Sequence, residues 1–312
     1  MSIIIPDQNL KIYNYLFPTE KSVFELQKIS FLTTIDLTER FSRFPIYKNM
    51  RASIMKTTDS RKKKLLESLR GGLIVSCQTQ PGDPIHSEEM PVKMALAAEW
   101  AGAVGIRANS PEQISSIRAE VKLPIIGLWK ITHEGTDVYI TPTLDAARAI
   151  WEAGAEIIAM DCTDRTTHQN TKAYELLPII KKEIPEAILF ADVSTYDEAK
   201  RAISLGADIV APTLHGYTES TKHNEIPDMR QFARMCRDFG NDAYVIMEGH
   251  INTPEDAMKC ISLAAHAVVV GSAITRPHLI AKCFVDVLSN RGQGIVDNGQ
   301  WIDNRGKNEE NT

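Results

Sequence analysis

The sequence predicts an α/β protein of the (β/α)8 or TIM barrel class, preceded by a mostly helical N-terminal extension. Short apolar runs alternate with helical segments eight times between residues 72 and 288. Three of the helices are followed by the same Gly-Ala pair, at Gly102, Gly154 and Gly206. Glycine is a typical C-cap residue that leads a helix into the next strand. A repeated strand-helix unit over roughly 220 residues has the usual length of such a barrel.

The last two units carry a further sign of this fold. A strand over 244–247 ends in Glu248-Gly249, and a strand over 267–270 ends in Gly271-Ser272. Amide groups at such turns, close to a helix start, favour a bound dianion. In these barrels the loops after strands seven and eight form the usual phosphate site. The sequence therefore predicts that the barrel binds a phosphorylated ligand.

Eight short apolar runs, each too short for a helix, are predicted to be buried strands. They cover residues 73–77, 103–106, 124–129, 156–160, 187–191, 208–212, 244–247 and 267–270. The helices between them begin at capping residues, as at Ser110-Pro111-Glu112 and Thr253-Pro254-Glu255, where a cap, a proline and an acid follow one another. The other helices are expected at 92–100, 144–152, 172–183, 195–205, 228–239 and 277–288, with an extra extended piece at 138–141.

The remaining segments do not follow this rhythm. Residues 1–68 are expected to form an extension of unknown role, with short helices at 22–30, 34–41 and 59–70. The barrel is expected at 69–290, and the polar tail at 291–312 is predicted to be disordered. The basic run at 61–64 invites an anionic partner, but a solvated helix face is the simpler interpretation.

Composition excludes several classes of function. The 312 residues carry a net charge of −5, which gives no reason to expect nucleic acid or an anionic membrane as a partner. No run of 18 apolar residues is present, so no transmembrane helix is expected, and the N-terminus lacks the pattern of a secretory signal. The five cysteines form no CxxC motif. We therefore expect reduced thiols and a cytoplasmic protein.

Polar residues at the predicted strand ends define the candidate site, because all strands of a barrel end at one mouth. The seven residues are Gln78, Arg107, Lys130, Asp161, Asp192, Glu248 and, one turn into the last loop, Arg276. Chance supplies one or two polar residues at such positions. Seven indicate a binding or catalytic site.

Three of these residues suggest chemistry. Lys130 leaves an apolar strand, and a buried lysine close to another cation has a lowered pKa and can act as a base. Glu248 could be the matching acid, and Arg276 could grip a phosphate. The competing interpretations are a structural ion pair for Lys130, a solvated turn residue for Glu248 and a pair with a loop carboxylate for Arg276.

Other site types lack their motifs. The eight histidines show no HxH or HExxH spacing, so no metal site is expected. GxGxxG and GxxxxGK[ST] are also absent, so neither a dinucleotide nor a P-loop site is indicated. His215, in the sixth loop, remains a residue that could touch a substrate.

Several segments together resemble the N-acylglucosamine-6-phosphate 2-epimerase family. They are Leu73–Gln78, Ala103–Ala108, Pro124–Gly127 with Lys130, Tyr139–Thr143, Ala191–Ser194, Thr213–Thr218, Glu248-Gly249 and Val270–Pro277. The resemblance covers about residues 69–289. It implies a (β/α)8 barrel that interconverts N-acetylmannosamine 6-phosphate and N-acetylglucosamine 6-phosphate, in amino-sugar and sialic acid catabolism. It also implies that no metal or organic cofactor is needed.

The resemblance assigns a role to each matching residue. It implies acid/base catalysis by Lys130 and Glu248, and contacts to the sugar from Gln78, Arg107 and Asp192. It places the phosphate on Gly249, Gly271, Ser272 and Arg276. The sequence departs from the family pattern at Ile131, where many members have a basic residue, at Ser272, which replaces a second glycine, and at Pro212.

Two other functions stay open at this point. Another phosphosugar barrel enzyme, such as an aldose-ketose isomerase or a ring-closing synthase, would keep the phosphate site but not Gln78, Arg107, Lys130 and Glu248 together. A catalytically silent phosphosugar-binding protein would keep the site without turnover. A homodimer is an open option, and the sequence does not say which residue removes the C2 proton or whether the sugar ring opens first.

Overall fold

The computed structural model describes residues 59–224 and 226–289. The chain divides into two compact units, Met1–Arg61 and Lys62–Thr312, and the second unit holds the fold described below. The predicted helices at 22–30 and 34–41 and the tail at 291–312 lie outside the described residues.

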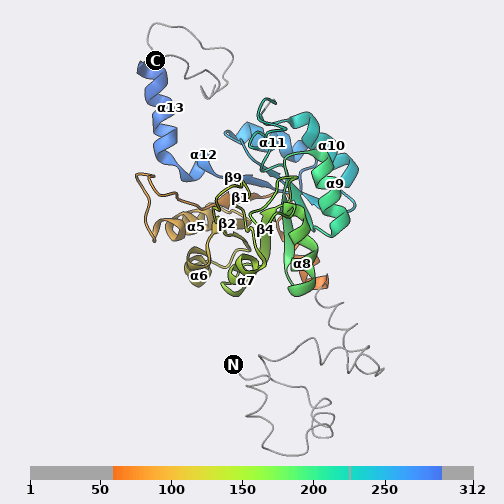
Figure 1. The fold of residues 1–312 in the computed structure, drawn as a ribbon. Coiled ribbons are helices and arrows are strands. Elements are labelled where there is room, and N and C mark those ends of the chain that lie inside the picture. The colour runs from red at the N-terminus through yellow and green to blue at the C-terminus, as the bar shows by residue number, and fades with distance from the viewer. Residues whose placement is uncertain (1–58, 225, 290–312) are drawn as a thin grey trace, which may run out of the picture. The chain divides into compact units, whose positions relative to one another are not determined.

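A single sheet of parallel strands forms the centre of this unit (Figure 1). The strands are β1 (Leu73–Ser76), β2 (Gly105–Asn109), β3 (Ile125–Leu128), β4 (Ile157–Asp161), β5 (Ile188–Asp192), β6 (Ile209–Ala211), β7 (Tyr244–Val245), β8 (Met247–Glu248) and β9 (Val268–Val270). Their order in the sheet is β7-β6-β5-β4-β3-β2-β1-β9-β8.

The sheet closes on itself through one stretch of chain. β7 and β8 flank Ile246 in a single run, yet β7 pairs with β6 while β8 pairs with β9. The Ile246 N–H donates to the Val210 carbonyl at 3.1 Å, so the run stays attached to β6 up to the point where β8 begins. Both edges of the sheet therefore lie in residues 244–248, and the predicted eight-stranded barrel is confirmed.

Helices surround the strands (Figure 1). They are α5 (Met90–Trp100), α6 (Pro111–Glu120), α7 (Leu144–Glu152), the 3-10 turn η1 (Ala173–Glu175), α8 (Leu176–Glu183), α9 (Tyr196–Leu205), α10 (Met229–Phe239), α11 (Pro254–Ser262) and α12 (Ser272–Thr275). The last helix, α13 (Pro277–Ser289), buries no residue and extends away from the strands (Figure 1). The predicted cap residues Ser110 and Thr253 each accept a backbone N–H of their helix. At α9 a full capping box forms between Thr195 and Glu198, which satisfies amides that a helix start otherwise leaves open.

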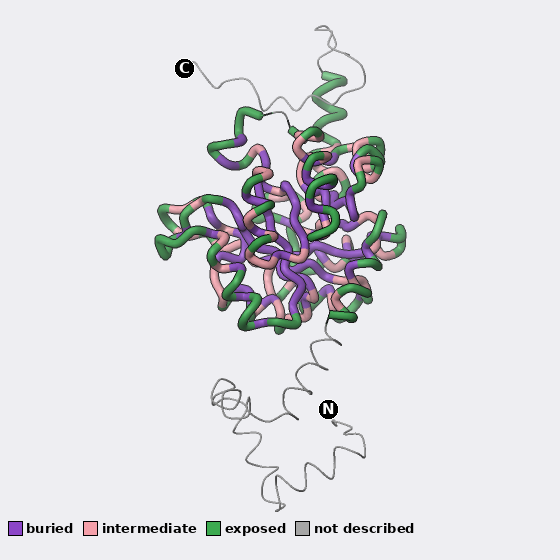
Figure 2. The backbone as a smooth tube through the Cα atoms, turned by 90° about the vertical axis from the view of Figure 1, so that its right-hand side faces the viewer, coloured by how far each residue is buried: buried purple, intermediate pink, exposed green. Residues whose placement is uncertain are grey.

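Two layers of apolar side chains separate inside from outside, because successive side chains of a strand point to opposite faces. Ile126, Ile157 and Phe190 belong to the cluster inside the barrel, whereas Ile125 and Ile158 pack outward with the helices. Figure 2 shows this arrangement as buried central strands with exposed backbone on the outside. Burying one such side chain contributes about 1.5–3 kcal/mol, so the barrel can hold a few charged residues at its mouth.

A helix over 59–68 leads into the barrel. Its Leu66 and the following Leu69 are buried in the inner cluster, and Nε2 of His266 lies 2.7 Å from the Leu66 carbonyl oxygen. These contacts lie at the N-terminal ends of the strands, opposite the mouth. The compact unit that holds the barrel begins at Lys62.

The second strand lies two residues later than predicted. Residues 103–106 were expected to be extended, but β2 covers Gly105–Asn109. The Ala103 N–H still donates to the Ala98 carbonyl at 3.0 Å, so the closing turn of α5 delays the strand. Arg107 consequently lies within β2, next to the outward-packed Ile106, and its side chain points into the barrel.

Candidate active site

The predicted strand-end residues do meet at one end of the barrel. The carboxyl ends of the parallel strands β1, β2, β3, β5 and β8 all lie at that end. They bring together Gln78, Arg107, Lys130, Asp192 and Glu248.

Arg107 is the centre of this group. Its Nη2 donates to Asp192 Oδ2 at 2.8 Å, and its Nη1 donates to Glu248 Oε2 at 2.6 Å. The guanidinium carbon lies 5.0 Å from the centre of the Phe190 ring, and the arginine is only 2% exposed. Removing one partner from such a buried pair leaves an uncompensated charge, so the three residues depend on one another.

Glu248 is held close to neutrality. Burial and the neighbouring charge of Asp192 raise its pKa to about 7, against the opposing effect of Arg107. A carboxyl group with this pKa exchanges a proton readily near neutral pH. The interpretation of Glu248 as a solvated turn residue is wrong, because the residue is only 9% exposed.

The pKa of Lys130 is shifted in the opposite direction. Burial, together with the positive charges of Arg107 and Arg276, lowers its pKa to about 8, against the opposing effect of Glu248 and Asp192. Its backbone N–H donates to Asn109 Oδ1 at 2.8 Å, which fixes the residue at the end of β3. Within the described part of the chain, no carboxylate oxygen lies close enough to the Lys130 ammonium group, at 4.0 Å or less, to form an ion pair with it.

Several buried polar atoms beside this group lack a partner. They are Gln78 Oε1, Arg107 Nε and Asp192 Oδ1, with no hydrogen bond in the described structure. Gln78 is held by a hydrogen bond from its Nε2 to Ser76 Oγ at 2.9 Å. Unpaired buried polar atoms cost about 1–3 kcal/mol each, so a ligand rich in hydroxyl groups would fit here.

The predicted phosphate residues lie at the ends of the last two strands. Gly249 has a φ of 108°, which favours glycine. Gly271 caps α12 without a side-chain hydrogen bond, so the first amides of the helix, including that of Ser272, have no cap. Thr275 Oγ1 donates to the Ser76 carbonyl at 3.0 Å and thereby ties α12 to the end of β1.

Arg276 also has the alternative partner that the sequence left open. Its Nη2 lies 3.7 Å from Asp83 Oδ2, in the loop between β1 and α5. Sequence reasoning missed Asp83, which stands in a Pro-Gly turn without any signal of its partner. The remaining predicted site residue, Asp161 at the end of β4, pairs with Arg165 and accepts hydrogen bonds from Thr163, so it anchors its own loop.

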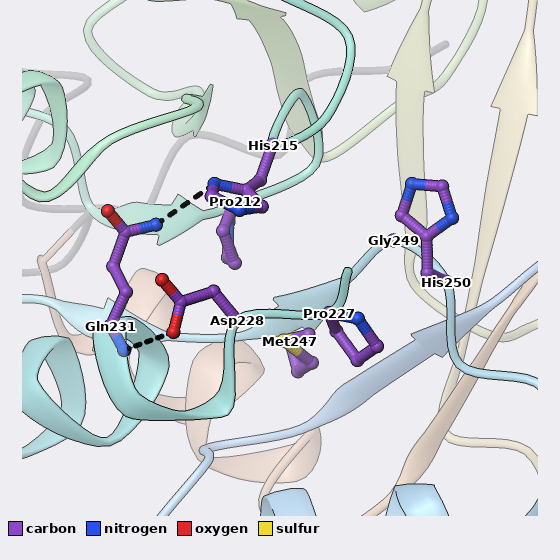
Figure 3. Close-up of a pocket in the computed structure, with 8 residues that line it drawn as sticks. All are labelled: Pro212, His215, Pro227, Asp228, Gln231, Met247, Gly249 and His250. Carbon is purple, nitrogen blue, oxygen red and sulfur yellow. Dashed lines mark hydrogen bonds between the residues drawn. The ribbon is translucent and has the colours of Figure 1, made fainter. Parts of the chain in front are cut away.

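A small pocket lies beside the Glu248 turn (Figure 3). It is lined by Pro212, His215, Pro227, Asp228, Gln231, Met247, Gly249 and His250. His215 is buried, with Nδ1 at 2.9 Å from the Ser194 carbonyl oxygen and 3.3 Å from Gln231 Nε2. Its contact with a substrate stays a prediction.

Among residues 59–224 and 226–289, no group of three or more His, Cys, Asp and Glu side chains is placed to hold a metal ion. In the same part of the chain, each helix is too short or too polar to cross a bilayer.

Comparisons with known proteins agree with one another. A family described as "Putative N-acetylmannosamine-6-phosphate epimerase" matches residues 91–290. The "Putative N-acetylmannosamine-6-phosphate 2-epimerase" of Caldanaerobacter subterraneus subsp. tengcongensis is 44% identical over 73% of this chain and 95% of that protein. The protein of the same name from Listeria welshimeri is 44% identical over 70% of this chain and 93% of its own length.

Solved structures give the same result. The N-acetylmannosamine-6-phosphate 2-epimerase from Clostridium perfringens matches with a TM-score of 0.67 and 37% identity, over 71% of this chain and 95% of that chain. The aldolase QR15 matches with a TM-score of 0.51 at 17% identity, which shows a shared fold alone.

Proposed function

The chain belongs to the N-acetylmannosamine-6-phosphate epimerase family, and from this premise we propose that it interconverts N-acetylmannosamine 6-phosphate and N-acetylglucosamine 6-phosphate. One observation about the site carries the proposal. A lysine with a pKa of about 8 and a glutamate with a pKa of about 7 lie on different strands of one mouth, around a buried arginine. Two such groups can exchange protons with a carbon acid from two sides.

The reaction needs no oxidant and no second substrate. C2 of the open-chain sugar is next to the C1 carbonyl, so its proton is acidic. A base takes this proton while the C2–H electron pair moves into the enolate. An acid then returns a proton to the opposite face of C2, and the electron pair forms the new C2–H bond. The product differs from the substrate only in the configuration at C2.

Lys130 and Glu248 are proposed as this acid and base. They end β3 and the 244–248 run, which is the seventh strand of the eight-stranded barrel, so they stand four strands apart across the mouth. Their pKa values of about 8 and about 7 mean that a proton on either costs little near neutral pH. Arg107 keeps the Glu248 carboxylate in place.

Substrate binding divides between two sides of the mouth. We assign the sugar hydroxyl and amide groups to Gln78, Arg107 and Asp192, whose unpaired buried atoms need partners. The phosphate is assigned to Gly249, Gly271, Ser272 and Arg276, where amide groups and a guanidinium meet. No metal or organic cofactor is included in this proposal.

Proton NMR in deuterated water tests the proposed activity directly. N-acetylmannosamine 6-phosphate with the protein should lose its C2 proton signal while the signals of the other epimer grow in. Because C2 carries the acetamido nitrogen and cannot become a ketone without losing it, an aldose-ketose isomerase would leave this sugar unconverted and act instead on an aldose 6-phosphate with a C2 hydroxyl. Unchanged signals together with measurable binding would support a silent binding protein.

We also propose that the chain forms a homodimer through α13. This apolar helix has no buried residue, with Val285, Val287 and Leu288 each more than half exposed, and it extends away from the strands (Figure 1). The barrel helices α5 and α11 also expose apolar side chains, Leu96 and Met258, which a second copy could contact. Residues 290–312 contain only four large apolar residues, Ile295, Val296, Trp301 and Ile302, so a second copy is the better cover.

Light scattering after gel filtration tests the dimer. The parent should have twice the mass of the chain, and Val285→Glu with Leu288→Glu should reduce it to one chain. A parent of single-chain mass would reject the proposal. The cytoplasmic location and the role in sialic acid catabolism, both expected from the sequence, stay predictions.

A further inference from the structure

One carboxylate lies between an arginine and a histidine side chain at the edge of the mouth. Asp83 Oδ1 is 3.3 Å from His278 Nε2, and Asp83 Oδ2 is 3.7 Å from Arg276 Nη2. All three side chains are largely buried, with 12%, 19% and 21% of their surface exposed for Asp83, His278 and Arg276. The cluster joins the β1–α5 loop to the start of α13.

The carboxylate is fixed from its own side. Asp83 Oδ2 accepts the Gln80 N–H at 2.8 Å, and the Asp83 N–H donates to the Gln80 carbonyl at 3.0 Å. Thr79 Oγ1 and His86 Nδ1 lie 2.9 Å apart and close the same loop. The loop therefore presents Asp83 as a preformed turn.

Asp83 does not use the full hydrogen-bonding capacity of Arg276 and His278. Charge-assisted N–H···O contacts are usually about 2.7–2.9 Å long, and both contacts to Asp83 exceed that. His278 Nδ1 is buried without a hydrogen-bond partner in the described structure. Arg276 also acts on Lys130, whose pKa it helps to lower, so its charge reaches the mouth. The cluster thus has unused capacity for an anion.

A phosphate dianion matches that capacity better than a single carboxylate does. It carries more charge and more acceptor oxygens, and a forked guanidinium binds it well. The proposed phosphate residues Gly271 and Ser272 are only a few positions before Arg276 in the chain. Asp83 and the phosphate would then compete for the same two side chains.

We propose that Asp83 is an internal counter-ion which the substrate phosphate displaces from Arg276 and His278, and that His278 is a further ligand of that phosphate. The inference rests on the proposed function for the identity of the anion. Because binding must first release Asp83, the apparent affinity is reduced by the fraction of molecules in which the contact is open.

Inorganic phosphate is the probe for this inference, followed by phosphorus NMR titration of the full chain. Asp83→Asn removes the competing charge but keeps an oxygen for the Gln80 N–H, and it should bind phosphate about 3- to 10-fold more tightly. Glu89→Gln is the matched control. It removes a carboxylate at the end of the same loop that pairs with Lys93 on α5, and it should leave phosphate affinity within twofold.

The His278 variants test the second half independently. His278→Ala should bind phosphate more weakly, whereas His278→Gln, which keeps an N–H donor, should recover part of the affinity. If His278 only neutralised Asp83, its loss would leave phosphate binding equal or tighter, and that result would overturn its role. The phosphate titrations of the His278 variants still test the role of His278 if Asp83→Asn fails to fold, which circular dichroism would reveal.

Weaker phosphate binding by folded Asp83→Asn would overturn the counter-ion. These titrations require no turnover, so the inference can fail while the epimerase reaction is observed by proton NMR. Conversely, tighter phosphate binding by Asp83→Asn in a chain without epimerase activity would retain this inference and reject the proposed function.

Discussion

Nη1 of Arg107 lies 2.6 Å from Oε2 of Glu248, so a residue assigned to the sugar also holds a residue assigned to proton transfer. The same guanidinium donates to Asp192 at 2.8 Å. Catalytic position and binding position are therefore coupled at this point of the barrel. A change at Arg107 cannot affect one without the other.

Arg107→Ala should destabilise the fold by about 3–5 kcal/mol, because it leaves two buried carboxylates without their cation. Chemical denaturation measures the free energy of unfolding. Arg148→Ala is the control, since its pair with Glu183 is far more exposed, and such pairs contribute at most about 1 kcal/mol. Equal losses for both variants would show that Arg107 is not the buried centre of the mouth.

The sequence could predict most of the mouth for a local reason. A short apolar run followed by a polar residue marks a strand end, and this rule found Lys130, Asp192 and Glu248. Arg107 was found by the same rule although it lies inside β2, because the turn after α5 delays the strand. The rule indicates which residues gather, since the barrel geometry supplies the rest.

The partners within the mouth could not be predicted in this way. Asp83 meets Arg276 and His278 only because the loop after β1 lies beside the segment after β9. That proximity comes from the pairing of β1 with β9, and no residue near Asp83 in the sequence indicates it. The packing of Leu66 under the barrel was missed for the same reason.

Leu69→Ala should reduce stability by about 2–5 kcal/mol, the usual cost of a cavity in a packed core. Leu69 is fully buried in the inner cluster although it precedes the first strand. Ile179→Ala, on the exposed side of α8, is the matched control and should cost far less. Thermal unfolding of both variants decides whether the segment before β1 is part of the barrel core.

The pH dependence of turnover should be bell-shaped. One of the two groups must be protonated and the other not, so kcat/KM should fall below the Glu248 pKa of about 7 and above the Lys130 pKa of about 8. Either assignment of base and acid carries the same number of protons, so the profile reports the pair and not the direction. A flat profile between pH 6 and 9, roughly one unit beyond each pKa, would remove both groups from the mechanism.

Lys130→Met should abolish turnover and yet stabilise the protein near pH 7. The pKa of Lys130 is lowered from 10.5 to about 8 in the folded state, so the fold disfavours the ammonium form. Above pH 10.5 the lysine is neutral in both the folded and the unfolded chain, so it does not destabilise the fold there. As pH falls from 10.5 through the folded pKa of about 8, the unfolded chain takes up this proton first and the parent loses stability. With about 1.4 kcal/mol per pKa unit and partial exposure, the gain should be about 1–3 kcal/mol.

Urea denaturation at two pH values checks the sign. The advantage of Lys130→Met over the parent should be largest at neutral pH and should vanish near the unfolded pKa of 10.5. Lys93→Met is the control, because this exposed lysine pairs with Glu89 on the surface. An advantage that does not depend on pH would point to better packing and not to a buried charge.

Arg276→Ala should act on binding more than on chemistry. A phosphate held at Arg276 is remote from C2, so it anchors the ground state and the transition state alike, and its loss appears mainly in KM. A hydrogen bond to a charged group contributes about 1.5–3 kcal/mol, which corresponds to a rise in KM of roughly 10- to 150-fold.

The substrate without its phosphate separates this role from a general defect at Arg276. It should be a poor substrate for the parent and hardly worse for Arg276→Ala, because it has no phosphate to lose. Asp83 sharpens the comparison, since removing Arg276 also leaves that carboxylate with His278 alone. If steady-state kinetics show the same loss for both substrates, Arg276 is not the phosphate ligand. Its guanidinium must then act through Lys130, whose pKa it helps to lower.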